Sequence, residues 1–138
     1  MPKYSVILPV RNGGNLVKEC VNSILAQTNT DFNLLVLDNN SNDGTLQWIA
    51  ALNDARIFLY PSSGDLSMEE NWARIREIDK SEFMTLIGHD DMLQPHYLSE
   101  MERLIAKNPG ASLYQTHFSF IPSKGDLKQG RHNIIGAF

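Results

Sequence analysis

Short runs of apolar residues alternate along the chain with longer segments in which apolar residues recur every three or four positions. The runs are typical of buried strands and the longer segments of amphipathic helices. Strands are predicted at residues 4–8, 34–37, 57–60, 83–87 and 112–118. The first should stop at Pro9, because proline cannot donate a hydrogen bond inside a sheet. Strands alternating with helices predict an α/β protein whose mostly parallel sheet carries helices on both faces.

Each helical segment has one apolar face. In the first, the inward residues are Val17, Cys20, Val21, Ile24 and Leu25; in the second, Leu46, Ile49 and Leu52. The third should begin with a capping box at Ser67 and Glu70 and turn Trp72, Ile75 and Ile78 inward. The fourth should begin near Pro95, bury Leu98, Met101, Leu104 and Ile105, and stop at Asn108.

Composition narrows the class of protein. The 138 residues are enough for one domain, and 42% apolar with 20% charged residues is typical of globular proteins. A net charge of −4 gives no reason to expect nucleic acid, which is bound through Lys and Arg. The single Cys20 excludes an internal disulfide and suits a reducing compartment. No apolar run could span a bilayer, so we expect a cytoplasmic protein, with any membrane contact peripheral and at the inner face.

Polar clusters follow three of the predicted strands at the point where each strand ends. They are residues 10–13 after the first strand, residues 38–40 after the second, and Asp90 with Asp91 after the fourth. In an open parallel sheet, ligands bind beyond the carboxyl ends of the strands, where the strand order switches. The three clusters should therefore share one edge of the sheet.

Asp90 and Asp91 have the chemistry of a metal site. Magnesium and manganese take oxygen ligands, often one or two carboxylates together with substrate phosphates and water. Adjacent side chains of an extended backbone point to opposite sides, so one carboxylate could face a metal while the other reaches a ribose hydroxyl. The same pair could instead open a turn and cap the following helix.

The other two clusters also allow two interpretations each. Asp38 could accept a hydrogen bond from a nucleobase N–H, or it could form an Asx turn with its Asn-rich neighbours. Arg11 could meet a phosphate or stay solvated. Residues 12–14 precede a helix whose N–H groups could help to bind an anion. No dinucleotide fingerprint or GxxxxGK[ST] phosphate loop occurs.

Several motifs together resemble glycosyltransferase family 2, in its amino-terminal half. Residues 5–12, SVILPVRN, are similar to the family's SVIxPxxN, and residues 38–45, DNNSNDGT, to its D-[DN]-x-S-x-D-G-T. Residues 23–28, SILAQT, fit its SIxxQT stretch, and Asn71-Trp72 falls at an NWN or RN motif. Residues 88–91, GHDD, correspond to the family's DxD or DD metal motif. The resemblance spans roughly residues 3–120.

The resemblance implies a Rossmann-like GT-A nucleotide-diphospho-sugar transferase fold and inverting transfer from a nucleoside diphosphate sugar to a glycan or lipid-linked acceptor. By the same resemblance, the donor-binding residues would be Pro9, Val10, Arg11, Asp38, Asn39, Asn71 and Asp90. Asp90 would face the ribose, and Asp91, together with Asp90, would bind manganese or magnesium. The implied setting is polysaccharide or cell-surface glycan synthesis.

Two departures from the family pattern affect these expectations. Asn39 stands where many members have aspartate. The family's catalytic base lies beyond residue 138, so residues 1–138 should form one incomplete GT-A domain, the donor-binding half, inactive as a transferase by itself. Apolar surface exposed by truncation could promote self-association.

Two other functions compete with a transferase. One is a module that binds a nucleotide or sugar-nucleotide without chemistry. The other is a flavodoxin-like receiver, which also ends a strand in aspartate but needs a lysine near the end of its fifth strand. Thr116, His117 and Phe118 occupy that region here.

Overall fold

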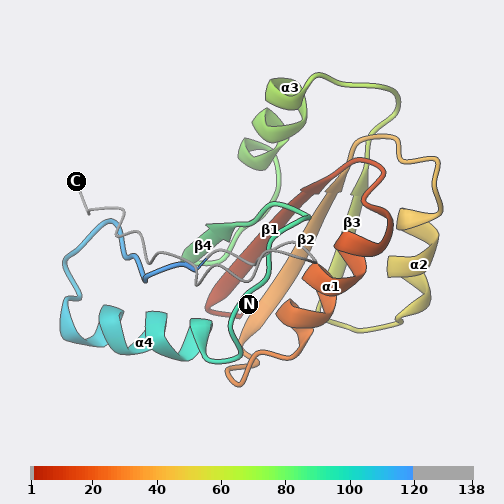
Figure 1. Ribbon diagram of the computed structural model, residues 1–138. Helices are drawn as coiled ribbons and strands as arrows, with labels where there is room; N and C mark the ends of the chain where they lie inside the picture. The colour runs from red at the N-terminus through yellow and green to blue at the C-terminus, as the bar shows by residue number, and fades with distance from the viewer. Residues whose placement is uncertain (1, 120–138) are drawn as a thin grey trace. The chain divides into compact units, whose positions relative to one another are not determined.

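A computed structural model describes residues 2–119 and divides at Pro95 into two compact units, each described here by itself. The first contains strands β1 (Tyr4–Val10), β2 (Phe32–Asp38), β3 (Ile57–Pro61) and β4 (Phe83–Leu86). They form one four-stranded sheet in the order β3-β2-β1-β4, and all neighbouring strands are parallel (Figure 1). The predicted parallel α/β architecture is confirmed.

Helical segments cover both faces of this sheet. The first unit contains α1 (Gly14–Leu25), α2 (Thr45–Ala51), α3 (Met68–Ala73) and the 3-10 helix η1 (Arg74–Arg76). On one face, Ile7, Leu35 and Leu37 form a buried cluster against Ile75 and Ile78. The alternate residues of the strands point to the opposite face, on which α1 lies (Figure 1). That face is also closely packed, because a methyl group at Gly13, the N-cap of α1, would lie 3.2 Å from Val10 Cγ2 on β1.

β1 continues through Pro9 to Val10, two residues beyond the predicted end. The carbonyls of Lys3 and Ile7 accept hydrogen bonds on the β4 side, from Phe83 and Ile87. In a parallel strand every second residue faces the same neighbour, so the nitrogen of Pro9 also faces the β4 side. β4 ends at Leu86, paired with Ile7, so Pro9 costs the sheet no ladder bond.

The capping box of α3 forms as predicted, but the helix is shorter than its apolar pattern suggested. Ser67 Oγ accepts from the N–H of Glu70 at 3.2 Å, and Glu70 Oε2 accepts from the N–H of Ser67 at 2.7 Å. α3 ends at Ala73 and tightens into η1, which changes the helical periodicity. Ile75 and Ile78 still pack on the sheet, whereas Trp72 is 46% exposed. The prediction that Trp72 points inward is wrong.

The second unit contains α4 (Tyr97–Lys107), which buries Leu98 and Met101 and has Asn108 as its C-cap, as predicted. The predicted strand at residues 112–118 does not form in the described chain, where only Phe118 makes an isolated bridge. Leu113, the most apolar residue of this segment, remains 62% exposed, so the segment buries too little side chain to support a strand.

Between residues 2 and 119, no helix combines the length and the apolar composition needed to cross a bilayer.

Candidate functional site

The strand order places a switch point beside β1. From β1 the chain builds β2 and β3 on one side, then reverses to add β4 on the other. The crevice beyond the carboxyl ends of β1 and β4 is the usual ligand site of such a sheet. The loop after β1 and the turn after β4 both emerge here, and β2 ends beside them, with Asp38 paired to Val10.

Asp38 ends β2 and is only 2% exposed. Its Oδ2 accepts from the N–H of Ser41 at 3.1 Å, so one carboxylate oxygen holds the local turn, through a bond three residues on rather than the two of an Asx turn. Its Oδ1 is also buried but has no hydrogen-bond partner among the described residues. A buried acceptor without a donor costs about 1–3 kcal/mol, which a bound ligand with a suitably placed N–H would recover.

Asn39 is 5% exposed and holds a neighbouring loop. Its Nδ2 donates to the carbonyl of Leu66 at 2.8 Å, and its Oδ1 accepts from the N–H of Leu66 at 2.9 Å. Its carboxamide is therefore engaged by the protein. The predicted contact of Asn39 with a donor stays a prediction.

Asn71 is buried and connects α3 to the sheet. Its Nδ2 donates to the carbonyl of Leu37 at 3.1 Å, and its Oδ1 accepts from Arg74 Nη1 at 2.8 Å. The Arg74 guanidinium also donates to the carbonyls of Asp38 at 3.2 Å, Tyr60 at 2.7 Å and Pro61 at 3.0 Å. Arg74 thus joins the carboxyl ends of β2 and β3.

Sequence reasoning missed Arg74. Its only signal was a basic residue three positions after Asn71, the spacing that brings two side chains together on a helix.

Arg11 follows β1 and is paired with an acidic residue that the sequence did not single out. Its Nη2 lies 3.1 Å from Asp65 Oδ2, and Asn40 Nδ2 donates to Asp65 Oδ1 at 3.0 Å. The hydrogen bond from Asn40, and then the charge of Arg11, lower the pKa of Asp65. Both side chains of the ion pair are solvent-exposed, and such pairs contribute little in water. Arg11 can therefore exchange this partner for a ligand phosphate at small cost.

The loop after β1 is joined to the loop after β2. Ser41 Oγ accepts from the N–H of Asn12 at 2.9 Å, and Thr45 Oγ1 from the N–H of Gly13 at 3.1 Å. Asp43 Oδ2 accepts from the N–H of Gly14 at 2.9 Å. The expected anion at the start of α1 is therefore supplied by the chain's own Asp43. These bonds explain Ser, Asp and Thr in the 38–45 motif.

Asp90 and Asp91 lie in a tight turn closed by a 3.1 Å bond from the N–H of Asp91 to the carbonyl of Gly88. A methyl group at Gly88 would lie 2.9 Å from Asp90 Oδ1 and 3.1 Å from Asp91 Oδ2. The two carboxylates therefore converge on Gly88, and the extended backbone from which opposite directions were expected does not form.

Two converging, exposed carboxylates fit a manganese or magnesium ion that takes its remaining ligands from a diphosphate and water. Among residues 2–119, no group of three or more His, Cys, Asp or Glu side chains is arranged around one point, so these residues alone offer no complete cage. Asp90 and Asp91 do not cap the following helix, which was the competing interpretation. The N-cap of α4 is His96, without a side-chain capping bond.

Cys20 belongs to the core, as predicted, and lies under the acidic turn. It is fully buried, and its Sγ donates to the carbonyl of Gly88 at 3.5 Å. Burial, and then the charges of Asp91 and Asp90, raise the pKa of the Cys20 thiol to about 12. Cys20 is therefore a neutral thiol that packs α1 against this turn.

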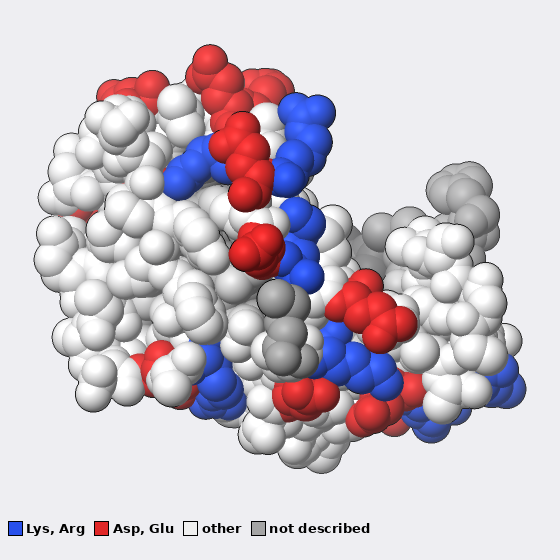
Figure 2. Space-filling view, turned by 180° about the vertical axis from the view of Figure 1, so that it is seen from behind, with Lys and Arg blue, Asp and Glu red and all other residues white. Residues whose placement is uncertain are grey.

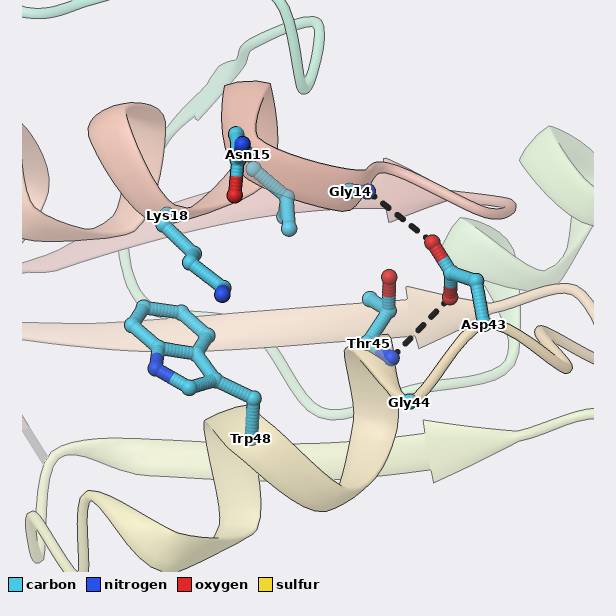
Figure 3. Close-up of a pocket in the computed structure, with 8 residues that line it drawn as sticks. Gly14, Asn15, Lys18, Asp43, Gly44, Thr45 and Trp48 are labelled. Atoms are coloured by element: carbon cyan, nitrogen blue, oxygen red, sulfur yellow. Dashed lines mark hydrogen bonds between the residues drawn. The ribbon is translucent and has the colours of Figure 1, made fainter.

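A small open cavity of about 190 Å³ lies between α1 and α2 (Figure 3). Its floor includes Trp48, with Lys18 Nζ placed 5.8 Å from the ring centroid. The lining residues are Gly14, Asn15, Val17, Lys18, Asp43, Gly44, Thr45 and Trp48. None of the predicted donor-binding residues lines it. On the face shown in Figure 2, acidic and basic side chains are intermixed.

The sequence profile of glycosyl transferase family 2 matches residues 5–136. The chain belongs to glycosyl transferase family 2. Its relatives in the family include an uncharacterized glycosyltransferase, RT0329, of Rickettsia typhi, which is 28% identical over 106 residues. The aligned region covers 77% of this chain and 33% of that relative, so the chain spans about a third of that relative's length.

Solved glycosyltransferase structures share the fold. Staphylococcus aureus TarS 1-349, in complex with UDP-GlcNAc, aligns with a TM-score of 0.70 over 82% of this chain and 37% of that one, at 22% identity. The mannosyltransferase PcManGT from Pyrobaculum calidifontis, in complex with GDP-Man and Mn2+, aligns with a TM-score of 0.61 over 76% and 32%, at 21% identity. At these identities the likeness shows the fold alone.

Proposed function

We propose that this family 2 chain is the donor-binding part of an inverting, metal-assisted glycosyltransferase that uses a nucleoside diphosphate sugar. The nucleotide lies along the carboxyl edge of the sheet, with its base at Asp38 and its diphosphate at Asp90 and Asp91. The acceptor is a glycan or a lipid-linked glycan, and the enzyme works in the cytoplasm or at the inner face of the membrane.

The observation that carries the proposal is the free, buried Oδ1 of Asp38. A carboxylate only accepts hydrogen bonds, so its partner must be a donor. Uracil, thymine and guanine each carry a ring N–H that fits this requirement, whereas the corresponding ring nitrogen of cytosine is an acceptor. We therefore assign Asp38 to an N–H-bearing base, such as the bases in the ligands of TarS and PcManGT.

The acidic turn supports the diphosphate end of the proposal. Asp90 and Asp91 present converging oxygens that suit a hard divalent cation but need further ligands, which phosphate oxygens supply. When bound, such a cation neutralises the charge that develops on the departing diphosphate. Arg11, paired with the exposed Asp65, adds a second positive group that can reach a phosphate.

The chain's own residues in this scheme bind and orient the donor. Asp38 fixes the base, Asn71 and Arg74 hold the strand ends around it, and the acidic turn fixes the diphosphate. Inverting transfer then needs an acceptor hydroxyl to attack the anomeric carbon from the side opposite the diphosphate while a base takes its proton. We assign that base to sequence beyond residue 138.

Calorimetric titration with UDP, GDP, dTDP and CDP, each with and without Mn2+, tests the proposal. We expect at least one N–H-bearing diphosphate to bind more tightly than CDP, and Mn2+ to strengthen that binding. If none of the four diphosphates binds, the proposal is wrong.

Substitution of Asp38 by Asn gives a sharper test of the base contact. The variant can keep the acceptor for Ser41 and presents an N–H where the wild type has Oδ1. Binding of the preferred diphosphate should fall by about tenfold or more, while CDP should lose less or gain. Asp79→Asn, which changes an exposed carboxylate, is the matched control. An unchanged ratio of the two affinities would contradict the assignment.

Asp91→Asn tests the metal contact separately. Loss of one of two converging carboxylates should reduce the strengthening by Mn2+ and leave metal-free binding nearly unchanged. Metal dependence equal to that of the wild type would remove Asp91 from the metal site.

A further inference from the structure

The side chain of Asn39 ties the loop between β3 and α3, residues 62–66, to the carboxyl end of β2. Both groups of its carboxamide meet the peptide of Leu66, at 2.8 and 2.9 Å. The backbone N–H of Asn39 also donates to the carbonyl of Val10 at 2.8 Å. One buried residue thus joins β1, β2 and this loop.

We propose that Asn39 is a positioning residue for the nucleotide pocket, and that it acts as an amide clamp on Leu66 which aspartate cannot replace. This inference rests on the proposed function for its effect on the nucleotide. The clamp itself is a property of the folded chain.

The clamp needs an amide because a peptide group offers one donor and one acceptor. The Asn39 carboxamide offers the complementary pair, and both bonds form. A carboxylate has acceptors only, so Asn39→Asp leaves the Leu66 carbonyl without its donor. It also adds a negative charge next to Asp38, which is 2% exposed.

The clamped loop borders Asp38. The N–H of Ser62 donates to the Asp38 carbonyl at 2.8 Å. In the same loop, Asp65 forms an ion pair with Arg11 and accepts a hydrogen bond from Asn40. The Arg11–Asp65 pair is exposed, with side-chain exposures of 46% and 62%, whereas Asn39 is 5% exposed. Water competes with the exposed Arg11–Asp65 ion pair but not with the buried hydrogen bonds of Asn39. Loss of the clamp therefore loosens the segment that brackets the base-binding carboxylate.

The charged groups around residue 39 determine how an Asn39→Asp variant titrates. They include the adjacent Asp38, Arg74, which donates to the Asp38 carbonyl, and the Arg11–Asp65 pair, in which Asp65 precedes Leu66. The guanidinium of Arg74 is committed to four oxygens, and that of Arg11 to Asp65. Burial and the adjacent Asp38 therefore dominate and raise the pKa of the new carboxyl.

Protonation of the new carboxyl in the Asn39→Asp variant would restore the clamp, since its O–H donates to the Leu66 carbonyl and its other oxygen accepts from the Leu66 N–H. With the folded pKa above the ordinary value of about 4, the clamp is present at low pH. It is lost as the pH rises through the folded pKa. Burial alone also makes the stability of such a variant depend on pH. The clamp is therefore distinguished by recovery of Asn39→Asp toward the wild type at low pH, beyond the level of Asn39→Ala, which has no group to re-form the two bonds.

The experiment compares urea unfolding of the wild type and three variants between pH 4.5 and 8. Asn39→Asp should be destabilised at pH 8 and approach the wild type at pH 4.5. Asn39→Ala, which removes both bonds without adding a charge, should be destabilised at every pH. Asn42→Asp adds the same charge at an exposed position of the segment between β2 and α2, which also contains Asn39, and is the matched control.

The second measurement is the affinity for UDP and GDP in the same series, expressed relative to the wild type at each pH. For Asn39→Asp we expect a loss of about tenfold at pH 7.5 that shrinks to within about threefold at pH 5. Asn39→Ala should show a loss of affinity at pH 7.5 that does not shrink at pH 5. This variant still tests the clamp if Asn39→Asp fails to fold.

The outcomes separate the two proposals. If the wild type binds neither nucleotide, the proposed function fails, and the unfolding series still decides whether the clamp exists. If the wild type binds but Asn39→Asp behaves like Asn42→Asp at every pH, the positioning role is overturned. A pH-independent loss in both Asn39 variants would make Asn39 a packing residue only.

Discussion

Asp43 caps a helix that begins 29 residues before it in the sequence, with its Oδ2 2.9 Å from the N–H of Gly14. Its Oδ1 accepts from the N–H of Thr45 at 3.0 Å, the first residue of α2. One carboxylate therefore serves the starts of both α1 and α2. This arrangement sets the spacing of the loops that follow β1 and β2.

Replacement of Asp43 by alanine should lower the free energy of unfolding by about 1 kcal/mol, the usual cost of losing a capping side chain. Hydrogen bonds, first from the Thr45 hydroxyl and then from backbone N–H groups, lower the pKa of Asp43. Its contribution is therefore present above the ordinary aspartate pKa and is lost as the pH falls through the lowered value. Urea unfolding at pH 7 and at pH 3 measures both effects. Asp79→Ala is the control, and an equal loss in both variants would refute the capping role.

Gly13 is required by close approach of α1. An added methyl group would lie 2.6 Å from Val17 Cβ in α1 and 3.2 Å from Val10 Cγ2 on β1, and a Cβ atom cannot move aside without its backbone. We expect Gly13→Ala to destabilise the protein by about 1–3 kcal/mol, as overpacked cores do. Gly64→Ala, with open space around the new methyl group, should change the unfolding midpoint little. Equal midpoints for the two variants would show that α1 can retreat from the sheet.

Gly88 leaves room for the two carboxylates of the acidic turn. A methyl group there would lie 2.9 Å from Asp90 Oδ1 and 3.1 Å from Asp91 Oδ2, so Gly88→Ala must push the carboxylates apart. We expect the strengthening of diphosphate binding by Mn2+ to fall by about tenfold, with metal-free binding unchanged. Titrations with and without Mn2+ measure both quantities, and Gly64→Ala serves as the control. Unaltered Mn2+ dependence would mean that these oxygens are not the metal ligands.

Cys20 should be unreactive in the native protein. With a thiol pKa of about 12, the thiolate that alkylating reagents need is a very small fraction at pH 8. Burial at 0% exposure also blocks access. Mass spectrometry after iodoacetamide treatment should show labelling in urea and almost none without it. Rapid native labelling would show that the contact between α1 and the Gly88 turn opens readily.

The sequence predicted the sheet well because its strands are continuous apolar runs. Residues 34–37 lie at the centre of the observed β2, and the inward residues predicted for α1 are buried or half-buried. The predictions failed where a helix or strand ended at a different residue from the one that the apolar pattern indicated. Trp72 fell outside because α3 stops after one and a half turns, and β1 continued because Pro9 faces the side on which β4 ends.

The sequence predicted which residues gather at the carboxyl edge but not what each one contacts. Parallel pairing alone brings Asp38 beside Val10, so this proximity follows from the strand pattern. The partners of Arg11 and Asn39 lie in the loop after β3, which carries no apolar periodicity and whose path only the folded chain defines. The convergence of Asp90 and Asp91 likewise depends on a turn that their adjacency does not reveal.

The order β3-β2-β1-β4 makes the first strand to be synthesised an inner one. β1 can pair with β2 early, but its other edge must wait for Phe83 and its neighbours, about 80 residues later, to leave the ribosome. Until then a nascent chain presents an apolar strand edge of the kind that favours aggregation. The same delay keeps the switch-point crevice from forming before the acidic turn itself has been made. The nucleotide of the proposed function therefore cannot assist the early stages of folding and can stabilise only the completed sheet.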